Sequence, residues 1–261
     1  MTTAYPLNAS VKIIAHRGAS HDAPENTVSA ALLAWKQEAD GLEMDVHLTV
    51  DGHPVVIHDP TLARTTGVSG RVEEMLLAQL KGLDAGKWKS GHFAGEKIPV
   101  LEEILGTVPA GKRAVVEIKT KRDASMQVER AVTSAGLTED QLTLIAFDYD
   151  VLQKLKAAFP RCEALWLIGD RHVRGQSAVD ATLKEVFKQS RDAGFEGLNM
   201  WHGWPVDSVF VEAVHGAGLK LGVWTVDDAD FGRSLADAGV DYITTNRPDW
   251  IRMHLKQQSS G

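Results

Sequence analysis

The stretch LEMDVHLTVDGHPVVIH, residues 42–58, contains two β-branched runs separated by the dipeptide Asp51-Gly52. Asp-Gly between two strand patterns is the strongest short-range signal for a β-hairpin. The sequence therefore predicts strands at 42–50 and 54–58 that run antiparallel to each other.

A two-residue loop in this hairpin would pair Val50 with His53. Counting outward from that pair, one position along each strand at a time, sets Asp45 opposite His58. Side chains opposite each other in antiparallel strands have Cβ atoms roughly 5 Å apart. We therefore expect Asp45 and His58 to be cross-strand neighbours.

Strand-like runs alternate with helical patterns along the rest of the chain, and such alternation is typical of βα units around a parallel sheet. Two of the clearest helical patterns cover residues 25–39 and 177–194. The hairpin adds one strand beyond the eight of a closed barrel. The sequence thus predicts an α/β fold, a (β/α)8 TIM barrel with an extra hairpin strand near its second position. The seven further strand-like runs cover residues 11–15, 113–118, 142–146, 163–168, 197–200, 219–226 and 241–245.

Residues 59–99 interrupt this alternation with a glycine-rich segment, one short helical pattern and a long loop-like stretch. A segment of this length with little regular secondary structure is usually either functional or disordered. Its Trp88, Phe93 and scattered leucines favour an ordered insertion subdomain that packs on the barrel. We expect residues 1–261 to form a single TIM-barrel domain with this insertion at about 59–99.

The composition excludes several classes of partner. A formal charge of −7 and an isoelectric point near 5.8 argue against binding to nucleic acid or to an anionic membrane, because either needs a concentrated basic face. The N-terminal MTTAYPLNASVK lacks the pattern of a signal peptide, and no apolar stretch is long enough to anchor the chain in a membrane. We therefore expect a cytoplasmic protein.

Cys162 is the only cysteine, so neither an internal disulfide nor a thiolate metal cluster is possible.

Polar side chains occur where four of the predicted strands end. In a βα barrel the C-terminal ends of the strands are the usual place for catalytic residues. Alternation along a strand puts Glu43 on the same face as Asp45, and Glu117 on the same face as Lys119. The polar residues at these ends are His16 and Arg17, Glu43 and Asp45, His58 and Asp59, and Glu117 and Lys119.

Three carboxylates that converge in a barrel mouth repel one another unless a cation joins them. With oxygen ligands alone, the sequence predicts one divalent cation, Mg²⁺ or Ca²⁺, held by Glu43, Asp45 and Glu117. The alternative is that Glu43 and Asp45 form buried salt bridges with Arg17 and Lys119.

The charges at this site indicate the substrate. Three carboxylates, a divalent cation, Arg17 and Lys119 leave about one positive charge, which complements a phosphodiester anion. His16 and His58 would supply a general acid and a general base, because imidazole titrates near neutral pH. Phosphodiester cleavage needs charge stabilisation together with proton transfer at the attacking and leaving oxygens.

The order of motifs along nearly the whole chain resembles the glycerophosphodiester phosphodiesterase family. The motifs are HRG (16–18), PENT (24–27), E-x-D (43–45), T-x-DG-x-PVV-x-HD (49–59), RTTGVSG (64–70), IPVLEEIL (98–105), EIK (117–119) and VWTV (223–226). The resemblance implies a barrel related to that of the phosphoinositide phospholipases C. It also implies metal-dependent hydrolysis of glycerophosphodiesters, such as glycerophosphocholine or glycerophosphoethanolamine, to sn-glycerol 3-phosphate and an alcohol.

Residue by residue, the resemblance makes His16 and His58 the acid-base pair and makes Arg17 and Lys119 the groups that hold the phosphate. It makes Glu43, Asp45 and Glu117 the metal ligands.

Several points stay open at this stage. Trp224 either forms the floor of a glycerol pocket or packs in the core. Asn246, where a relative often has Asp, receives no role. The nucleophile is either water or the neighbouring glycerol hydroxyl. The alternative substrate class is a lysophospholipid, cleaved by a lysophospholipase D-type reaction.

Overall fold

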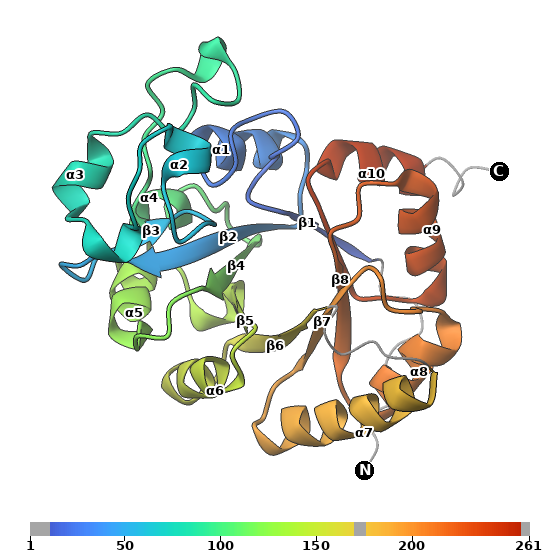
Figure 1. The fold of residues 1–261 in the computed structure, drawn as a ribbon. Helices are drawn as coiled ribbons and strands as arrows, with labels where there is room; N and C mark the ends of the chain where they lie inside the picture. The colour runs from blue at the N-terminus through green and yellow to red at the C-terminus, as the bar shows by residue number, and fades with distance from the viewer. Residues whose placement is uncertain (1–10, 170–175, 257–261) are drawn as a thin grey trace.

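The computed structural model describes residues 11–169 and 176–256. Eight parallel strands form a closed ring that helices surround on the outside (Figure 1). The ring closes because β1 pairs with β2 as well as with β9. The predicted TIM barrel is confirmed. The strands of the ring are β1 (Lys12–Ala15), β2 (Gly41–Leu48), β4 (Arg113–Ile118), β5 (Leu142–Ala146), β6 (Glu163–Ile168), β7 (Gly197–Trp201), β8 (Lys220–Trp224) and β9 (Tyr242–Thr245).

Helices connect these strands, and several begin at a side chain that accepts a hydrogen bond from the first helical turn. Asp207 accepts from the backbone N–H of Phe210, and Asp228 accepts from that of Phe231. Such caps satisfy backbone donors that have no partner inside the helix. The outer helices are α1 (Val28–Lys36), α4 (Leu101–Leu105), α5 (Ser125–Ser134), α6 (Tyr149–Ala158), α7 (Gln176–Asp192), α8 (Ser208–Gly216), α9 (Ala229–Ala238) and α10 (Pro248–Lys256).

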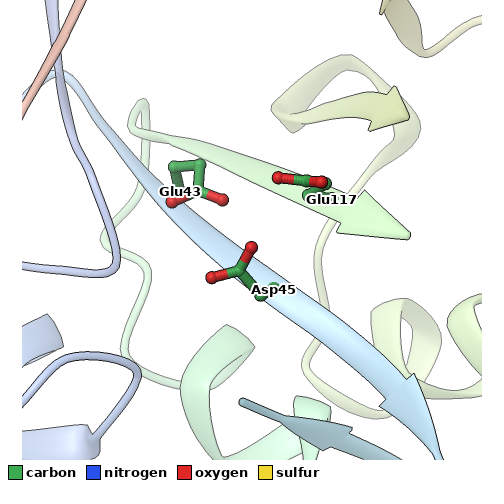
Figure 2. Close-up of side chains that lie close together, drawn as sticks. All are labelled: Glu43, Asp45 and Glu117. Atoms are coloured by element: carbon green, nitrogen blue, oxygen red, sulfur yellow. The ribbon is translucent and has the colours of Figure 1, made fainter. Parts of the chain in front are cut away.

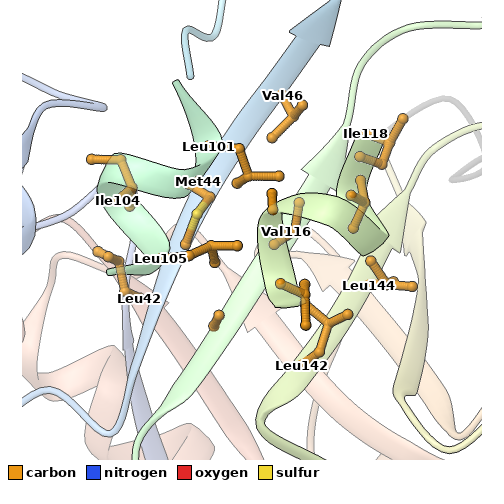
Figure 3. Close-up of a cluster of buried hydrophobic side chains, with 14 of the residues drawn as sticks. Leu42, Met44, Val46, Leu101, Ile104, Leu105, Val116, Ile118, Leu142 and Leu144 are labelled. Atoms are coloured by element: carbon orange, nitrogen blue, oxygen red, sulfur yellow. The ribbon is translucent and has the colours of Figure 1, made fainter. Parts of the chain in front are cut away.

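The main hydrophobic core lies between the strands and this helical layer (Figure 3). On β2, Leu42, Met44 and Val46 point outward into it, and Leu101 and Leu105 of α4 belong to the same cluster. Every residue of β2 is buried, so the residues between these three must point into the barrel. Packing of the apolar face therefore holds Glu43 and Asp45 inside the ring.

The N-terminal end of the barrel interior is closed by a polar cluster around Glu163. The Glu163 carboxylate accepts from Tyr242 Oη at 2.8 Å, lies 3.3 Å from Arg113 Nη1 and also pairs with Lys220. Above this cluster the interior is apolar. Polar groups at the opposite end of the strands therefore face a single open mouth. The apolar layer contains Ile14, Val115, Ile145, Leu165 and Leu167.

The extra strand is β3 (Pro54–Val56), which pairs antiparallel with β2 outside the ring, so the predicted hairpin is confirmed. Its predicted register is wrong by one residue. Val46 pairs with Val56, and the N–H of Ile57 donates to Asp45 O at 2.9 Å. Asp45 therefore lies opposite Ile57, and His58 follows one position further along.

The physical reason is the length of the hairpin loop. The N–H of Thr49 donates to His53 O at 3.0 Å, so Thr49 takes the place that was predicted for Val50. Three residues then form the loop, and Gly52 has a φ of +81°. A three-residue loop with glycine in this left-handed conformation is the next most common hairpin after the two-residue type.

Residues 59–99 form the lobe beside β3 in Figure 1. Its elements are α2 (Ala63–Thr66), η1 (Val72–Glu74), α3 (Leu77–Lys81) and η2 (Gly91–Phe93). Buried aliphatic side chains, among them Leu62, Val72 and Leu80, join this segment to Val55 of β3. Trp88 is 39% exposed, so aliphatic packing attaches the segment.

None of the helices in the described part of the chain is both long and apolar enough to cross a membrane.

Candidate active site

Three carboxylates from two neighbouring strands meet inside the barrel mouth (Figure 2). Glu43 and Asp45 lie two residues apart on β2, and Asp45 pairs in register with Glu117 on β4. One oxygen of each carboxylate lies within 4.8 Å of the other two. All three residues are buried, with exposed fractions of 2% for Glu43, 0% for Asp45 and 7% for Glu117.

Burial and mutual repulsion shift the pKa values of these groups. Burial, followed by the charge of Asp45, raises the pKa of Glu117 to about 7 and that of Glu43 well above its ordinary value. Burial acts on Asp45 in the same direction, but the charges of Lys119 and Arg17 outweigh it and lower the pKa of Asp45. Without a bound cation, Glu43 and Glu117 therefore hold their protons to a higher pH than free carboxyl groups do, whereas Asp45 stays ionised.

The oxygens of this cluster fit a hard divalent cation. Glu43 Oε2 accepts from the backbone N–H of Arg17 at 2.9 Å, whereas Glu43 Oε1 is buried and has no hydrogen-bond partner among the described residues. Buried polar atoms rarely remain without a partner. Carboxylate oxygens are the ligands that Mg²⁺ and Ca²⁺ prefer, so Glu43, Asp45 and Glu117 can hold such an ion.

Arg17 and Lys119 lie beside the carboxylates. They form some of the buried salt bridges that the sequence offered as the alternative to a metal site. Arg17 Nε lies 3.2 Å from Asp45 Oδ2, and Lys119 Nζ lies 3.1 Å from Asp45 Oδ1 and 2.7 Å from Glu117 Oε1. Burial lowers the pKa of Lys119, but Asp45 and Glu117 outweigh it and raise that pKa overall. Both cations are therefore charged, and within the described part of the chain neither of them is a hydrogen-bond partner of Glu43 Oε1.

His16 is held by a chain of hydrogen bonds from the far end of the sequence. Its Nδ1–H donates to Asn246 Oδ1 at 2.7 Å, and Asn246 Nδ2 donates to Asp227 Oδ2 at 2.6 Å. Burial, followed by the charge of Arg17, lowers the pKa of His16 to about 4. His16 is therefore neutral near pH 7.

His58 is held instead by a carboxylate. Its Nδ1–H donates to Asp59 Oδ1 at 2.8 Å, and Arg64 Nε donates to Asp59 Oδ2 at 2.6 Å. Arg64 also binds Glu25, which pairs with Arg17 at 3.0 Å. Burial lowers the pKa of His58 overall, and the charge of Asp45 and the hydrogen bond to Asp59 offset only part of this shift. The two imidazoles therefore have different partners, an amide for His16 and a carboxylate for His58.

Both histidines and the charged groups line one cavity of about 120 Å³. On the other side this cavity is apolar, and the Phe147 and Trp224 rings meet there edge to face with centroids 5.6 Å apart. Trp224 Nε1 donates to Asn199 O at 3.1 Å. The cavity therefore has a charged half, which suits an anion, and an uncharged half that is mostly apolar. Its wall consists of His16, Arg17, Glu43, His58, Glu117, Lys119, Ile145, Phe147, Leu167, Asn199, Trp224 and Thr244.

Comparison with known proteins identifies the family. A profile of the glycerophosphoryl diester phosphodiesterase family matches residues 16–250. The chain belongs to this family. It is 32% identical over 245 residues to the glycerophosphodiester phosphodiesterase of Caldanaerobacter subterraneus subsp. tengcongensis, which covers 92% of this chain and 95% of that relative.

Solved structures agree with this assignment. The chain is similar to a glycerophosphodiester phosphodiesterase from Agrobacterium tumefaciens, with 31% identity, a TM-score of 0.77 and coverage of 93% of this chain and 99% of that one. It is also similar to an Oleispira antarctica phosphodiesterase in complex with the product sn-glycerol-3-phosphate, with 29% identity, a TM-score of 0.82 and coverage of 95% and 98%. The chain is a phosphoric diester hydrolase of the glycerophosphodiester phosphodiesterase family.

In this glycerophosphodiester phosphodiesterase, sequence reasoning missed the residues that hold the predicted site residues in place. Asn26 of the PENT motif is buried, and its Nδ2 donates to Asp45 Oδ2 at 2.8 Å. The motif itself was a usable signal, because its polar residues are hard to explain by packing. Asn246 and Asp227 lie about 200 residues from His16, and nothing in the local sequence connects them with it. The other missed residues are Glu25, Asp59 as a partner of His58, Arg64 and Asn199.

Proposed function

We propose that this enzyme hydrolyses small glycerophosphodiesters, such as glycerophosphocholine or glycerophosphoethanolamine, to sn-glycerol 3-phosphate and an alcohol. The proposal rests on one observation above all. Three buried carboxylates and two oriented imidazoles line the same cavity. The names of the relatives and the sn-glycerol-3-phosphate bound to the Oleispira antarctica enzyme support the same substrate class.

We assign the divalent cation, Mg²⁺ or Ca²⁺, to Glu43, Asp45 and Glu117. When bound, such an ion polarises the non-bridging oxygens of a phosphate and offsets its charge. Arg17 and Lys119 then bind the diester anion from the same half of the cavity. Together these groups leave about one positive charge, which matches a singly charged phosphodiester.

The partners of the two histidines suggest their roles in proton transfer. Neutral His16 donates Nδ1–H to Asn246, so its Nε2 has a free lone pair and takes the proton from the attacking oxygen, that of water or of the neighbouring glycerol hydroxyl. His58 lies against the Asp59 carboxylate, which offsets part of the effect of burial on its pKa, so of the two imidazoles we assign His58 to protonate the oxygen of the leaving alcohol. A pair of this kind supplies both proton transfers that the reaction needs.

The size of the cavity favours a small substrate over a lysophospholipid. Pockets for drug-sized ligands enclose about 300–1,000 Å³, whereas this cavity encloses about 120 Å³. An acyl chain would have to extend across the surface of the protein. We therefore rank the lysophospholipase D-type reaction second.

The test measures sn-glycerol 3-phosphate release from glycerophosphocholine, and from lysophosphatidylcholine for comparison, with and without chelator. We expect chelator to abolish turnover, and Glu43→Ala and His16→Ala to lower kcat/KM by at least about 100-fold. Glu129→Ala and His92→Ala are matched controls, because both side chains are exposed and far from the cavity. Turnover that resists chelator, or full activity in either site variant, would contradict the proposal.

A further inference from the structure

Asn199 has a buried side chain that faces the active-site cavity. It lies on β7, which is four strands away from β2 in either direction around the eight-stranded ring and therefore opposite Glu43 and Asp45. The residue is 4% exposed and lines the cavity. Its Oδ1 is buried and has no hydrogen-bond partner among the described residues.

An amide in this position is costly for the protein by itself. A buried polar atom without a partner destabilises a fold, because it has lost its hydrogen bonds to water. The neighbouring walls, Ile145, Leu167 and Trp224, show that an apolar side chain would suit the site. The amide therefore needs a partner that the described chain does not supply.

Gly222 on β8 provides the space for this amide. Gly222 pairs in register with Asn199, and a Cβ atom on Gly222 would lie 2.7 Å from Asn199 Oδ1. Real Cβ atoms essentially never come this close to another heavy atom. Any larger residue at position 222 would displace the amide, so the glycine and the asparagine form one unit.

We propose that the Asn199 amide recognises the glycerol moiety of the substrate by hydrogen-bonding one of its hydroxyl groups. This inference rests on the proposed function. The phosphate binds in the charged half of the cavity, so the part of the substrate that reaches the opposite wall is an uncharged group next to the phosphorus. A hydroxyl both donates and accepts hydrogen bonds, as an amide does, whereas a quaternary ammonium head group does neither and a primary ammonium head group only donates.

The depth of Asn199 also favours glycerol over the head group. Glycerol is the part that all glycerophosphodiesters share, so a rigid wall at the bottom of a cavity can match it. Head groups differ in size and need the open mouth, where Phe147 is 45% exposed. Thr244 of β9 adds a second neutral polar residue to the wall of the cavity.

The test compares Asn199→Ala with wild type on glycerophosphoethanolamine and on two analogues, each of which lacks one of the two free glycerol hydroxyls. Wild type should prefer the full substrate over one of these analogues by about 10-fold in kcat/KM. In Asn199→Ala this preference should disappear, because the variant lacks the amide that would bond to the hydroxyl. The full substrate and the analogue then make the same contacts. Gly222→Ala should reproduce the effect. Gly216→Ala is its control, because nothing lies within 4 Å of a Cβ at that position.

A binding measurement separates recognition from folding. Asn199→Ala should weaken sn-glycerol 3-phosphate about 10-fold and leave the affinity for inorganic phosphate unchanged. Two results would overturn the inference while the proposed function stands. In one, Asn199→Ala lowers kcat/KM equally on all three substrates. In the other, the loss of kcat/KM depends on the head group and not on the glycerol hydroxyl. A wild-type enzyme that cleaves none of the three substrates would refute the proposed function and this inference together.

Discussion

His16 Nδ1 lies 2.7 Å from Asn246 Oδ1, although the two residues are 230 positions apart in the sequence. The Asn246 amide can only be oriented one way, because its Nδ2 donates to the Asp227 carboxylate at 2.6 Å. Its Oδ1 must therefore accept, and His16 must carry its proton on Nδ1. The lone pair of Nε2 is then free for the chemistry.

Asn246→Asp should move the acidic limb of the pH profile of kcat/KM to higher pH. Burial lowers the pKa of His16 to about 4, so the neutral base persists down to about that pH. A carboxylate in place of the amide would favour imidazolium and raise this pKa, so the base would be lost at a higher pH. Asp230→Asn, an exposed change on α9, is the control. An unchanged acidic limb would show that Asn246 does not act on His16.

Asp59→Asn should lower kcat by between about 10- and 100-fold, because it removes the carboxylate that orients His58 and favours its charged form. Arg64→Ala should have a smaller effect in the same direction, since Arg64 holds Asp59 in place. Arg71→Ala is the matched control, because Arg71 pairs with Glu73 on the surface of the same segment. Equal kcat values for the Arg64 and Arg71 variants would contradict this role.

The metal-free enzyme should lose stability as the pH rises between about 4.5 and about 7. The pKa of Glu117 rises from 4.5 to about 7 on folding, so the folded state holds a proton that the unfolded chain has released. The stabilisation is complete below the unfolded pKa and disappears as the pH passes the folded one. Melting temperatures measured across this pH range should fall less steeply with pH in Glu117→Gln than in wild type or in the exposed control Glu129→Gln.

Saturating Mg²⁺ or Ca²⁺ should raise the melting temperature of wild type near pH 7, because an ion that binds only the folded state stabilises it. The effect should be largest where the three carboxylates are ionised, and Glu43→Gln should reduce it. A melting temperature that changes with neither ion would argue against the cation site at Glu43, Asp45 and Glu117.

Leu142→Ala should lower the free energy of unfolding by about 2–5 kcal/mol, because it leaves a cavity in the core between β5 and the outer helices. Leu142 is 0% exposed, whereas Leu76 is 47% exposed, so Leu76→Ala should cost far less. Denaturant unfolding of the two variants measures the difference. Similar losses would mean that the core around β5 relaxes to fill the space.

The amino-acid sequence alone determined the architecture of the ring. Each strand has its own short apolar run, most of them with β-branched residues, and β4, β5 and β6 begin and end at the predicted residues. The period of two along β2 also placed Glu43 and Asp45 on one face, because alternation is a local property of an extended backbone. The hairpin register was missed because Asp51-Gly52 suits both two- and three-residue loops, and the choice between them depends on pairing that only the folded sheet supplies.

Only the tertiary structure decided which residues hold the site in place. Closure of the ring brings β9 beside β1, and this puts Asn246 against His16 and leaves Asn199 facing the carboxylates across the cavity. Such contacts join positions far apart in the chain, so no local pattern encodes them. Strand identity follows from neighbouring residues, whereas the partners of a catalytic group follow from how the whole barrel closes.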